Sequence, residues 1–192
     1  MITEKSVSSS AEQVLRQIEE EARRKFLPIV GPKKGKILAE EVRKAKPRHV
    51  LEVGTLIGYS AILMGKELNE NAEIVTIEIH RGEAQVAGEN VVRANIPPKV
   101  TIITGDALEV IPTLNGPFDF AFIDADKSEY FQYLRLSEDR FHKGTVVVAD
   151  NAGIFADQMS DYLDYVRNSG RYKSRYVQAG DDGMEISLKL QP

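Results

Sequence analysis

The sequence predicts an α/β protein built on a mostly parallel sheet with helices on both faces. From His49 onward, short apolar strands alternate with helical segments, and the links between them are short. Near the end of the chain, two strands flank a loop rich in glycine and aspartate. Alternating strands and helices are typical of a parallel sheet. The two last strands predict an antiparallel hairpin at its edge.

Length and composition narrow the class of protein. A chain of 192 residues fits one domain, which we expect to span 1–192. The formal net charge of −4 argues against a nucleic-acid partner. The absence of Cys excludes disulfides, zinc-thiolate sites and thiol nucleophiles. No apolar run has the length of a membrane span, and the N-terminus lacks a leader pattern, so we expect a cytoplasmic protein without membrane contact.

Two amphipathic helices are predicted before the sheet. Ser10 and Gln13 have the spacing of a capping box, and apolar residues then recur at helical steps as far as Phe26. A second apolar stripe runs from Pro32 to Ala45. The lysines at its start, including Lys34, are interpreted as a solvated face.

The remaining elements follow from the apolar pattern and the turn residues. Strands are predicted at 50–53, 74–79, 100–103, 118–123, 145–149, 172–178 and 184–190, and helices at 59–68, 83–94, 107–114, 130–140 and 159–167. If the first hairpin strand is parallel to the sheet, the second begins at the carboxyl-end rim, where such sheets bind ligands. We therefore expect Glu185 at that rim.

A glycine-containing loop and an acid predict a nucleoside site. Gly54 and Gly58 follow the first strand, where glycines let the backbone approach a ligand at a helix N-terminus. Glu78 ends the second strand, near the offset of ~20 residues at which an acid binds ribose hydroxyls. Leu56 replaces the middle glycine of a dinucleotide loop, and Glu52 lies beside it. These features favour S-adenosylmethionine, while an NAD-dependent oxidoreductase and a non-catalytic cofactor-binding subunit remain alternatives.

Polar side chains at two further strand ends predict a metal site. Asp124 follows the fourth strand, and Asp150 and Asn151 follow the fifth. Their oxygens suit a hard cation such as Mg²⁺ or Ca²⁺. The alternative is that these residues cap the helices that follow.

The order of the motifs resembles the cation-dependent O-methyltransferases, and within them the catechol O-methyltransferases. The resemblance runs from about Leu15 to the end of the chain, through these segments: 30–37, 51–60, 76–79, 124–127, 143–151, 165–167 and 182–185. It implies a Rossmann-like class I methyltransferase domain whose seven-stranded sheet has an antiparallel last strand. It also implies that N-terminal helices within 1–46 cover the substrate and cofactor site.

The resemblance also implies residue roles. It assigns the S-adenosylmethionine site to Val30, Glu52, Gly54, Ser60, Glu78, Ile79, Ala107 and Asp124. It assigns Mg²⁺, or Ca²⁺ or another divalent cation, to Asp124, Asp150 and Asn151. Lys127 resembles the general base, and Lys127, Asn151 and Glu185 would contact the substrate, a small aromatic diol. The implied protein is a monomer or homodimer.

The chain departs from that pattern at the expected substrate wall. It has no Trp, and Phe26 and Asp126 stand where the mammalian enzyme has tryptophans. The segment from Asp124 to Lys127 is closer to a caffeoyl-CoA-type branch. A caffeoyl-CoA-type or other vicinal-diol substrate therefore remains an alternative.

Overall fold

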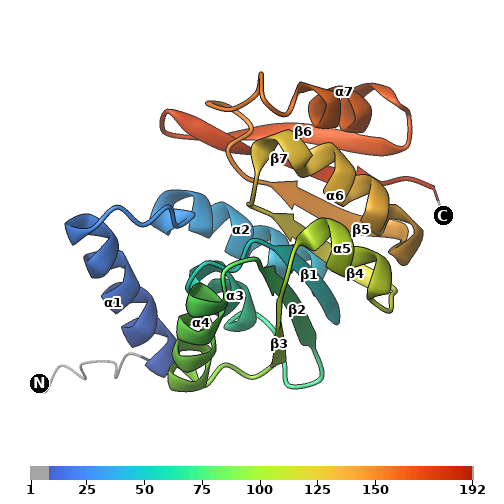
Figure 1. Cartoon of the computed structure of the whole chain (residues 1–192). Coiled ribbons are helices and arrows are strands. Elements are labelled where there is room, and N and C mark those ends of the chain that lie inside the picture. The colour runs from blue at the N-terminus through green and yellow to red at the C-terminus, as the bar shows by residue number, and fades with distance from the viewer. Residues whose placement is uncertain (1–8, 192) are drawn as a thin grey trace, which may run out of the picture.

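The structure is a computed structural model that describes residues 9–191. These residues form a seven-stranded sheet in the order β3-β2-β1-β4-β5-β7-β6 (Figure 1). Strand β7 pairs antiparallel with β5 and β6, and the other pairings are parallel. The predicted fold class is confirmed. The prediction of one domain over 1–192 includes residues 1–8 and 192, which lie outside the described residues.

The elements have the following bounds. The strands are β1 His49–Val53, β2 Glu73–Glu78, β3 Lys99–Thr104, β4 Phe118–Ile123, β5 Phe141–Ala149, β6 Tyr172–Ala179 and β7 Asp182–Lys189. The helices are α1 Ser10–Arg24, α2 Gly31–Ala45, α3 Tyr59–Gly65, α4 Arg81–Ala94, α5 Ala107–Val110, α6 Tyr130–Ser137 and α7 Ser160–Asn168. Three 3-10 turns are described as well, η1 Ile111–Thr113, η2 Lys127–Glu129 and η3 Glu138–Arg140.

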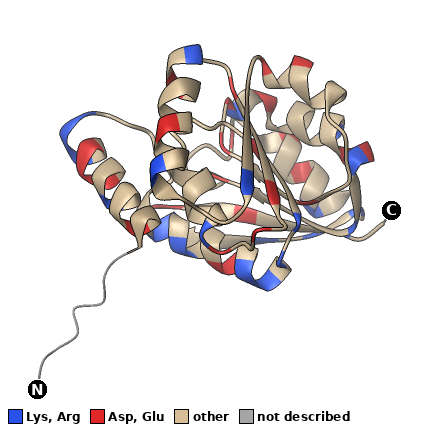
Figure 2. Cartoon of the chain, turned by 90° about the horizontal axis from the view of Figure 1, so that it is seen from below, with Lys and Arg blue, Asp and Glu red and all other residues tan. Residues whose placement is uncertain are grey.

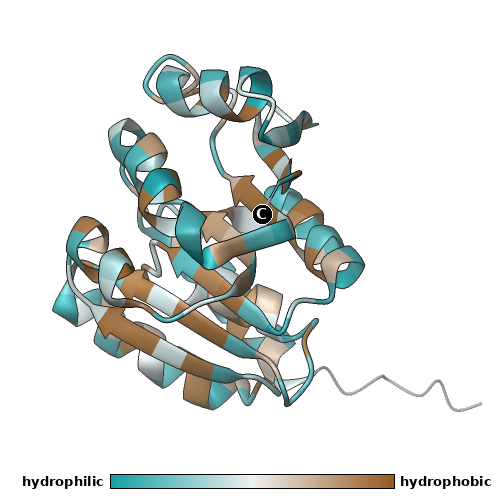
Figure 3. Cartoon of the chain, turned by 90° about the vertical axis from the view of Figure 1, so that its right-hand side faces the viewer, coloured by the Kyte–Doolittle hydropathy of each residue, from teal (hydrophilic) through white to brown (hydrophobic). Residues whose placement is uncertain are grey.

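The sheet separates two apolar clusters because successive strand residues point to opposite faces. Val50 of β1 packs in the cluster under α1, α2 and α3, whereas Leu51 packs in the cluster under α6 and α7. The strands carry mostly hydrophobic residues, and the helices carry hydrophilic ones as well (Figure 3). Acidic and basic positions are interspersed over the helices (Figure 2).

The first helix differs from its prediction at both ends. Ser9 rather than Ser10 caps it, because the Ser9 hydroxyl accepts a hydrogen bond from the backbone N–H of Glu12. The helix ends at Arg24, so Phe26 lies beyond it and is 92% exposed. Within residues 9–191, no helix is both long and apolar enough to cross a membrane.

The strand ends on one side of the sheet are joined by backbone hydrogen bonds. The N–H of Gly54 donates to Ile77, that of Asp124 to Val53, and that of Asp150 to Ile123, over 2.9–3.0 Å. These bonds continue the ladder past the ends of β2, β1, β4 and β5. The residues that follow these strands are therefore aligned along one rim.

Gly54 allows the closest approach along that rim. Its φ of +96° belongs to a region that side chains disfavour, and an added Cβ would lie 2.1 Å from the carbonyl oxygen of Asp124. Gly144 has a similar φ of +98°, but an added Cβ there meets nothing within 4 Å. Both positions would strain the backbone of a larger residue, but only Gly54 is crowded by a neighbouring atom.

This difference predicts that Gly54→Ala destabilises the protein far more than Gly144→Ala. The matched control, Gly144→Ala, is expected to lower the free energy of unfolding only by the backbone strain, roughly 1–2 kcal/mol. Gly54→Ala adds a collision between β1 and β4 to that strain. Urea unfolding of the two variants measures the free energies, and equal losses would contradict the close approach.

Candidate active site

The rim opens into a cavity of about 670 Å³. This volume lies within the usual range for small-molecule sites. Ten of the sequence-predicted site residues line it: Val30, Gly54, Ser60, Glu78, Ile79, Ala107, Asp124, Lys127, Asp150 and Asn151. The structure thus brings together residues from the segment before α2 and from the loops after β1, β2, β3, β4 and β5. Glu52 lies buried in β1 beside them.

Glu52 has a buried carboxylate with one oxygen unsatisfied. Its side chain is fully buried, and Oε2 accepts a 2.5 Å hydrogen bond from Thr76. Oε1 has no hydrogen-bond partner. Burial raises the pKa of Glu52 to about 7, although hydrogen bonds from Ser60 and Thr76 oppose the shift. A positively charged ligand group would offset the free-energy cost of burying the ionised carboxylate.

Glu78 orders the glycine-containing loop from the end of β2. Its Oε2 accepts from the backbone N–H of Leu56 at 2.7 Å, and its Oε1 accepts from that of His80 at 2.9 Å. Leu56 adopts a positive φ of 48°. The carboxylate therefore orders the loop and also lines the cavity.

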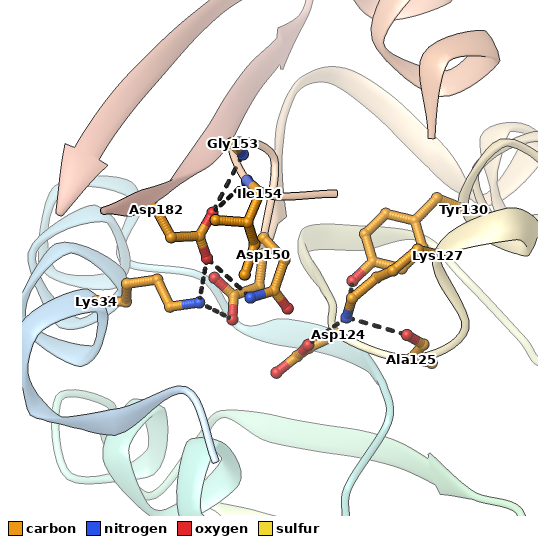
Figure 4. A network of polar contacts seen from close by, with 10 residues as sticks. Lys34, Asp124, Ala125, Lys127, Tyr130, Asp150, Gly153, Ile154 and Asp182 are labelled. Carbon is orange, nitrogen blue, oxygen red and sulfur yellow. Dashed lines mark hydrogen bonds and ion pairs between the residues drawn. The ribbon is translucent and has the colours of Figure 1, made fainter. Parts of the chain in front are cut away.

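Asp150 holds the second unsatisfied carboxylate oxygen. The residue is 1% exposed, and its Oδ1 has no hydrogen-bond partner. Burial, with a further contribution from the charge of Asp124, raises the pKa of Asp150 to about 7. Its Oδ2 accepts from the Lys34 ammonium at 2.7 Å (Figure 4). A buried oxygen without a donor, beside a second carboxylate, fits a cation ligand.

Lys127 lies on the other side of Asp124. Its Nζ is 2.9 Å from Asp124 Oδ1, 3.0 Å from the carbonyl oxygen of Ala125 and 2.9 Å from the Tyr130 hydroxyl (Figure 4). These three contacts hold the amine at the cavity wall.

The interpretation of Lys34 as part of a solvated face is wrong. Its Nζ bridges Asp150 and Asp182 at 2.7 and 2.8 Å, and only 14% of the side chain is exposed. These partners lie 116 and 148 residues further along the chain. A local sequence pattern does not reveal such a contact, because it forms only when the strands assemble into the sheet.

Two acids at the site were also missed. Asp182 begins β7 and accepts from Lys34 and Asn151. Asp106 lines the cavity and caps α5 by accepting from the backbone N–H of Leu108. Asp106 is the second residue after β3, so the strand-end signal that indicated Glu78 and Asp124 also applies to it.

Glu185 lies near the predicted rim, but its side chain does not face the cavity. Strand β7 begins at Asp182, so Glu185 lies inside the strand, where it pairs with Ala149. It is 1% exposed and accepts two hydrogen bonds from Arg167, at 2.9 and 2.7 Å. This pair directs the carboxylate to α7, and Glu185 is not among the residues that line the cavity.

The mouth of the cavity includes residues that precede α2. Phe26 and Pro28 line it, as does Asp126, whose carboxylate caps η2. The hydroxyl of Tyr59, another lining residue, donates a 2.6 Å hydrogen bond to Glu19 of α1. This bond connects α1 to the cavity wall. The part of 1–46 formed by residues 1–8 lies outside the described residues.

Comparison with known proteins identifies the family. A family model described as O-methyltransferase matches residues 4–169. The chain belongs to the O-methyltransferase family. The resemblance stated from the motifs is therefore confirmed, and the NAD-dependent oxidoreductase alternative loses its support.

Relatives and solved structures agree with this O-methyltransferase assignment. Catechol O-methyltransferase of Niastella koreensis is 40% identical over 126 residues, which cover 64% of this chain and 57% of that protein. Catechol O-methyltransferase of Sus scrofa is 33% identical over 176 residues, covering 85% of this chain and 94% of that protein. The structure of a Bacillus cereus O-methyltransferase in complex with SAH superposes with a TM-score of 0.82 at 28% identity, covering 97% and 93%.

The buried carboxylate of Glu52 predicts a pH dependence of stability. Between its ordinary pKa of 4.5 and about 7, Glu52 is protonated in the folded state and ionised in the unfolded chain. Unfolding then releases a proton, so the ligand-free protein is expected to lose stability as the pH rises through this window. Thermal midpoints measured across it check the sign.

The Glu52→Gln variant is expected to reduce this slope, because Gln does not titrate. Glu70→Gln, at an exposed position, is the matched control and should keep the wild-type slope. A Glu52→Gln slope equal to that of the wild type would show that other groups cause the dependence.

Proposed function

We propose that this chain transfers a methyl group from S-adenosylmethionine to one hydroxyl of a catechol-like vicinal diphenol, with the help of a divalent cation. The observation that carries the proposal is the pair of unsatisfied buried carboxylate oxygens, on Glu52 and Asp150, beside one cavity. The cofactor supplies an ammonium, and the metal supplies a second positive charge. Each would satisfy one of these oxygens.

The cofactor assignment rests on charge and on the relative's bound ligand. The Bacillus cereus relative is described in complex with SAH. In this chain, Glu52 would bind the ammonium of the methionine end, and Glu78 the ribose hydroxyls. Gly54 would allow close approach of the backbone. The remaining contacts would come from Val30, Ser60, Ile79, Ala107 and Asp124.

The cation would be held by the oxygens of Asp124, Asp150 and Asn151. Carboxylate and amide oxygens are the ligands preferred by Mg²⁺ and Ca²⁺. When bound, such an ion orients both oxygens of a diphenol and lowers the pKa of the coordinated hydroxyl. The free Oδ1 of Asp150 supports this role, because it is buried and has no donor within the protein.

Lys127 would receive the proton from the substrate hydroxyl. Its place in the cavity wall supports this role. Asn151 would contact the same hydroxyl from the end of β5. The phenolate oxygen would then bond to the methyl carbon of S-adenosylmethionine as the carbon–sulfur bond breaks, and the cofactor would leave as SAH. The negative oxygen and the positive sulfur become neutral together, so the protein contributes mainly alignment and exclusion of water.

A caffeoyl-CoA-type substrate is the second candidate. The segment from Asp124 to Lys127 resembles that branch, and the wall lacks tryptophan. Phe26 is 92% exposed at the mouth, which leaves space for a larger acceptor. N-terminal helices within 1–46 would then cover the reacting end of the substrate. In either case we propose a small-molecule partner and a monomer or homodimer.

The direct test of the function is methyl transfer from labelled S-adenosylmethionine to catechol and to caffeoyl-CoA. Turnover of one acceptor is expected to stop with EDTA and to return with excess Mg²⁺. Activity that ignores the chelator would refute the role of the metal. An absence of transfer to either acceptor, with SAH still bound, would favour the non-catalytic cofactor-binding subunit.

The proposed base predicts a large loss of turnover in Lys127→Met. Removing a positioned general base typically costs about 10²- to 10⁴-fold in rate. We expect kcat to fall by about 10²-fold or more and SAH affinity to be unchanged, since the variant leaves Glu52 and Glu78 in place. Lys143→Met, at an exposed lysine, is the matched control. A wild-type kcat in Lys127→Met would exclude the base.

A further inference from the structure

Asp182 contacts Asn151, a proposed cation ligand, and also Lys34, which in turn contacts the proposed ligand Asp150. Its Oδ2 accepts from Lys34 Nζ and from Asn151 Nδ2, both at 2.8 Å. Its Oδ1 accepts from the backbone N–H groups of Gly153 and Ile154, at 3.2 and 3.1 Å (Figure 4). One side chain from the start of β7 thus receives four donors, three of them from the segment that follows β5.

These contacts determine which atom Asn151 offers to the cavity. The amide group is planar, and its oxygen and nitrogen leave the same carbon in different directions. Since Nδ2 donates to Asp182, Oδ1 is directed away from it. Only the oxygen can ligate a cation, so a reversed amide would turn a donor toward the ion. Asn151 also has a positive φ of 61°, which the bonds from Asp182 to the following residues help to maintain.

Asp182 also affects the proposed cation site through its contact with Lys34. The Lys34 ammonium contacts Asp150 and Asp182 through Oδ2 of each. Asp182 therefore supplies a negative charge that offsets the ammonium. Without it, the ammonium would have Asp150 as its remaining partner and would neutralise a proposed metal ligand. Positive charge this close to the site opposes the approach of a divalent cation.

We propose that Asp182 is a positioning residue for the divalent cation. It directs Asn151 Oδ1 to the ion, and it balances the Lys34 ammonium so that Asp150 keeps its charge for the metal. The proposal rests on the cation site described under the proposed function. Asp182 itself does not contact the ion, and Lys34 weakens cation binding through its charge.

The test is binding of Mn²⁺, followed by electron paramagnetic resonance with no substrate or turnover involved. Asp182→Asn keeps the shape of the side chain and removes its charge. It is expected to weaken Mn²⁺ binding by about 10- to 100-fold, the usual effect of losing a residue that orients a metal ligand. SAH affinity and the thermal midpoint without metal report on the fold. Asp181→Asn, at the exposed neighbour, is the matched control.

The two lysines at the start of α2 give a test of opposite sign. Lys34→Met removes the ammonium and is expected to tighten Mn²⁺ binding, whereas Lys33→Met, at an exposed position, should leave it unchanged. Damage to the fold would weaken binding in both Lys34→Met and Asp182→Asn. This variant also decides the matter if Asp182→Asn does not fold, because weaker or unchanged binding in Lys34→Met would overturn the proposal.

Asp150→Asn separates this inference from the proposed function. If Asp150→Asn binds Mn²⁺ as tightly as the wild type, or if the wild type does not bind it, the cation site fails and the inference fails with it. If Asp150→Asn loses the ion while Asp182→Asn binds it normally, only the inference fails. Loss in both variants, with SAH affinity retained, supports the positioning role.

Discussion

The backbone of Gly54 lies so close to the carbonyl of Asp124 that no side chain fits between them, and the site depends on this contact. This contact joins the end of β1, where proposed cofactor residues lie, to the end of β4, where the proposed metal ligands begin. Backbone hydrogen bonds extend the same alignment to β2 and β5. The side chains proposed to bind the cofactor and those proposed to bind the metal therefore lie at one cavity.

Burial of charge is the second feature that these residues share. Glu52 and Asp150 each keep an oxygen without a partner, and burial raises the pKa of both carboxyl groups to about 7. Such groups reduce stability unless a ligand compensates them. Both lie where the proposed function would place positive charge, from the ammonium of the cofactor and from a metal. In the ligand-free protein the two buried carboxyl groups therefore lower stability, and positively charged ligands would offset this effect.

Much of this arrangement follows from local sequence signals. The alternation of strands and helices indicates the sheet, and acids at or directly after strand ends indicate Glu78, Asp124 and Asp150. The errors concern residues whose partners are distant in sequence. Lys34 resembles any solvated lysine until the sheet brings Asp150 and Asp182 to it. The contact of Glu185 with Arg167 depends on how α7 packs against the sheet, which the hairpin pattern does not encode. Asp106 is different, because its strand-end signal was available.

In the proposed function, the ends of β4 and β5 hold one divalent cation beside the cofactor. Anomalous X-ray scattering from crystals grown with SAH and Mn²⁺ tests it most directly, because the signal locates the ion itself. We predict a single peak in the cavity, bound by Asp124, Asp150 and Asn151, with SAH contacting Glu52 and Glu78. A peak elsewhere, or SAH bound in a cavity that contains no ion at saturating Mn²⁺, would contradict the account.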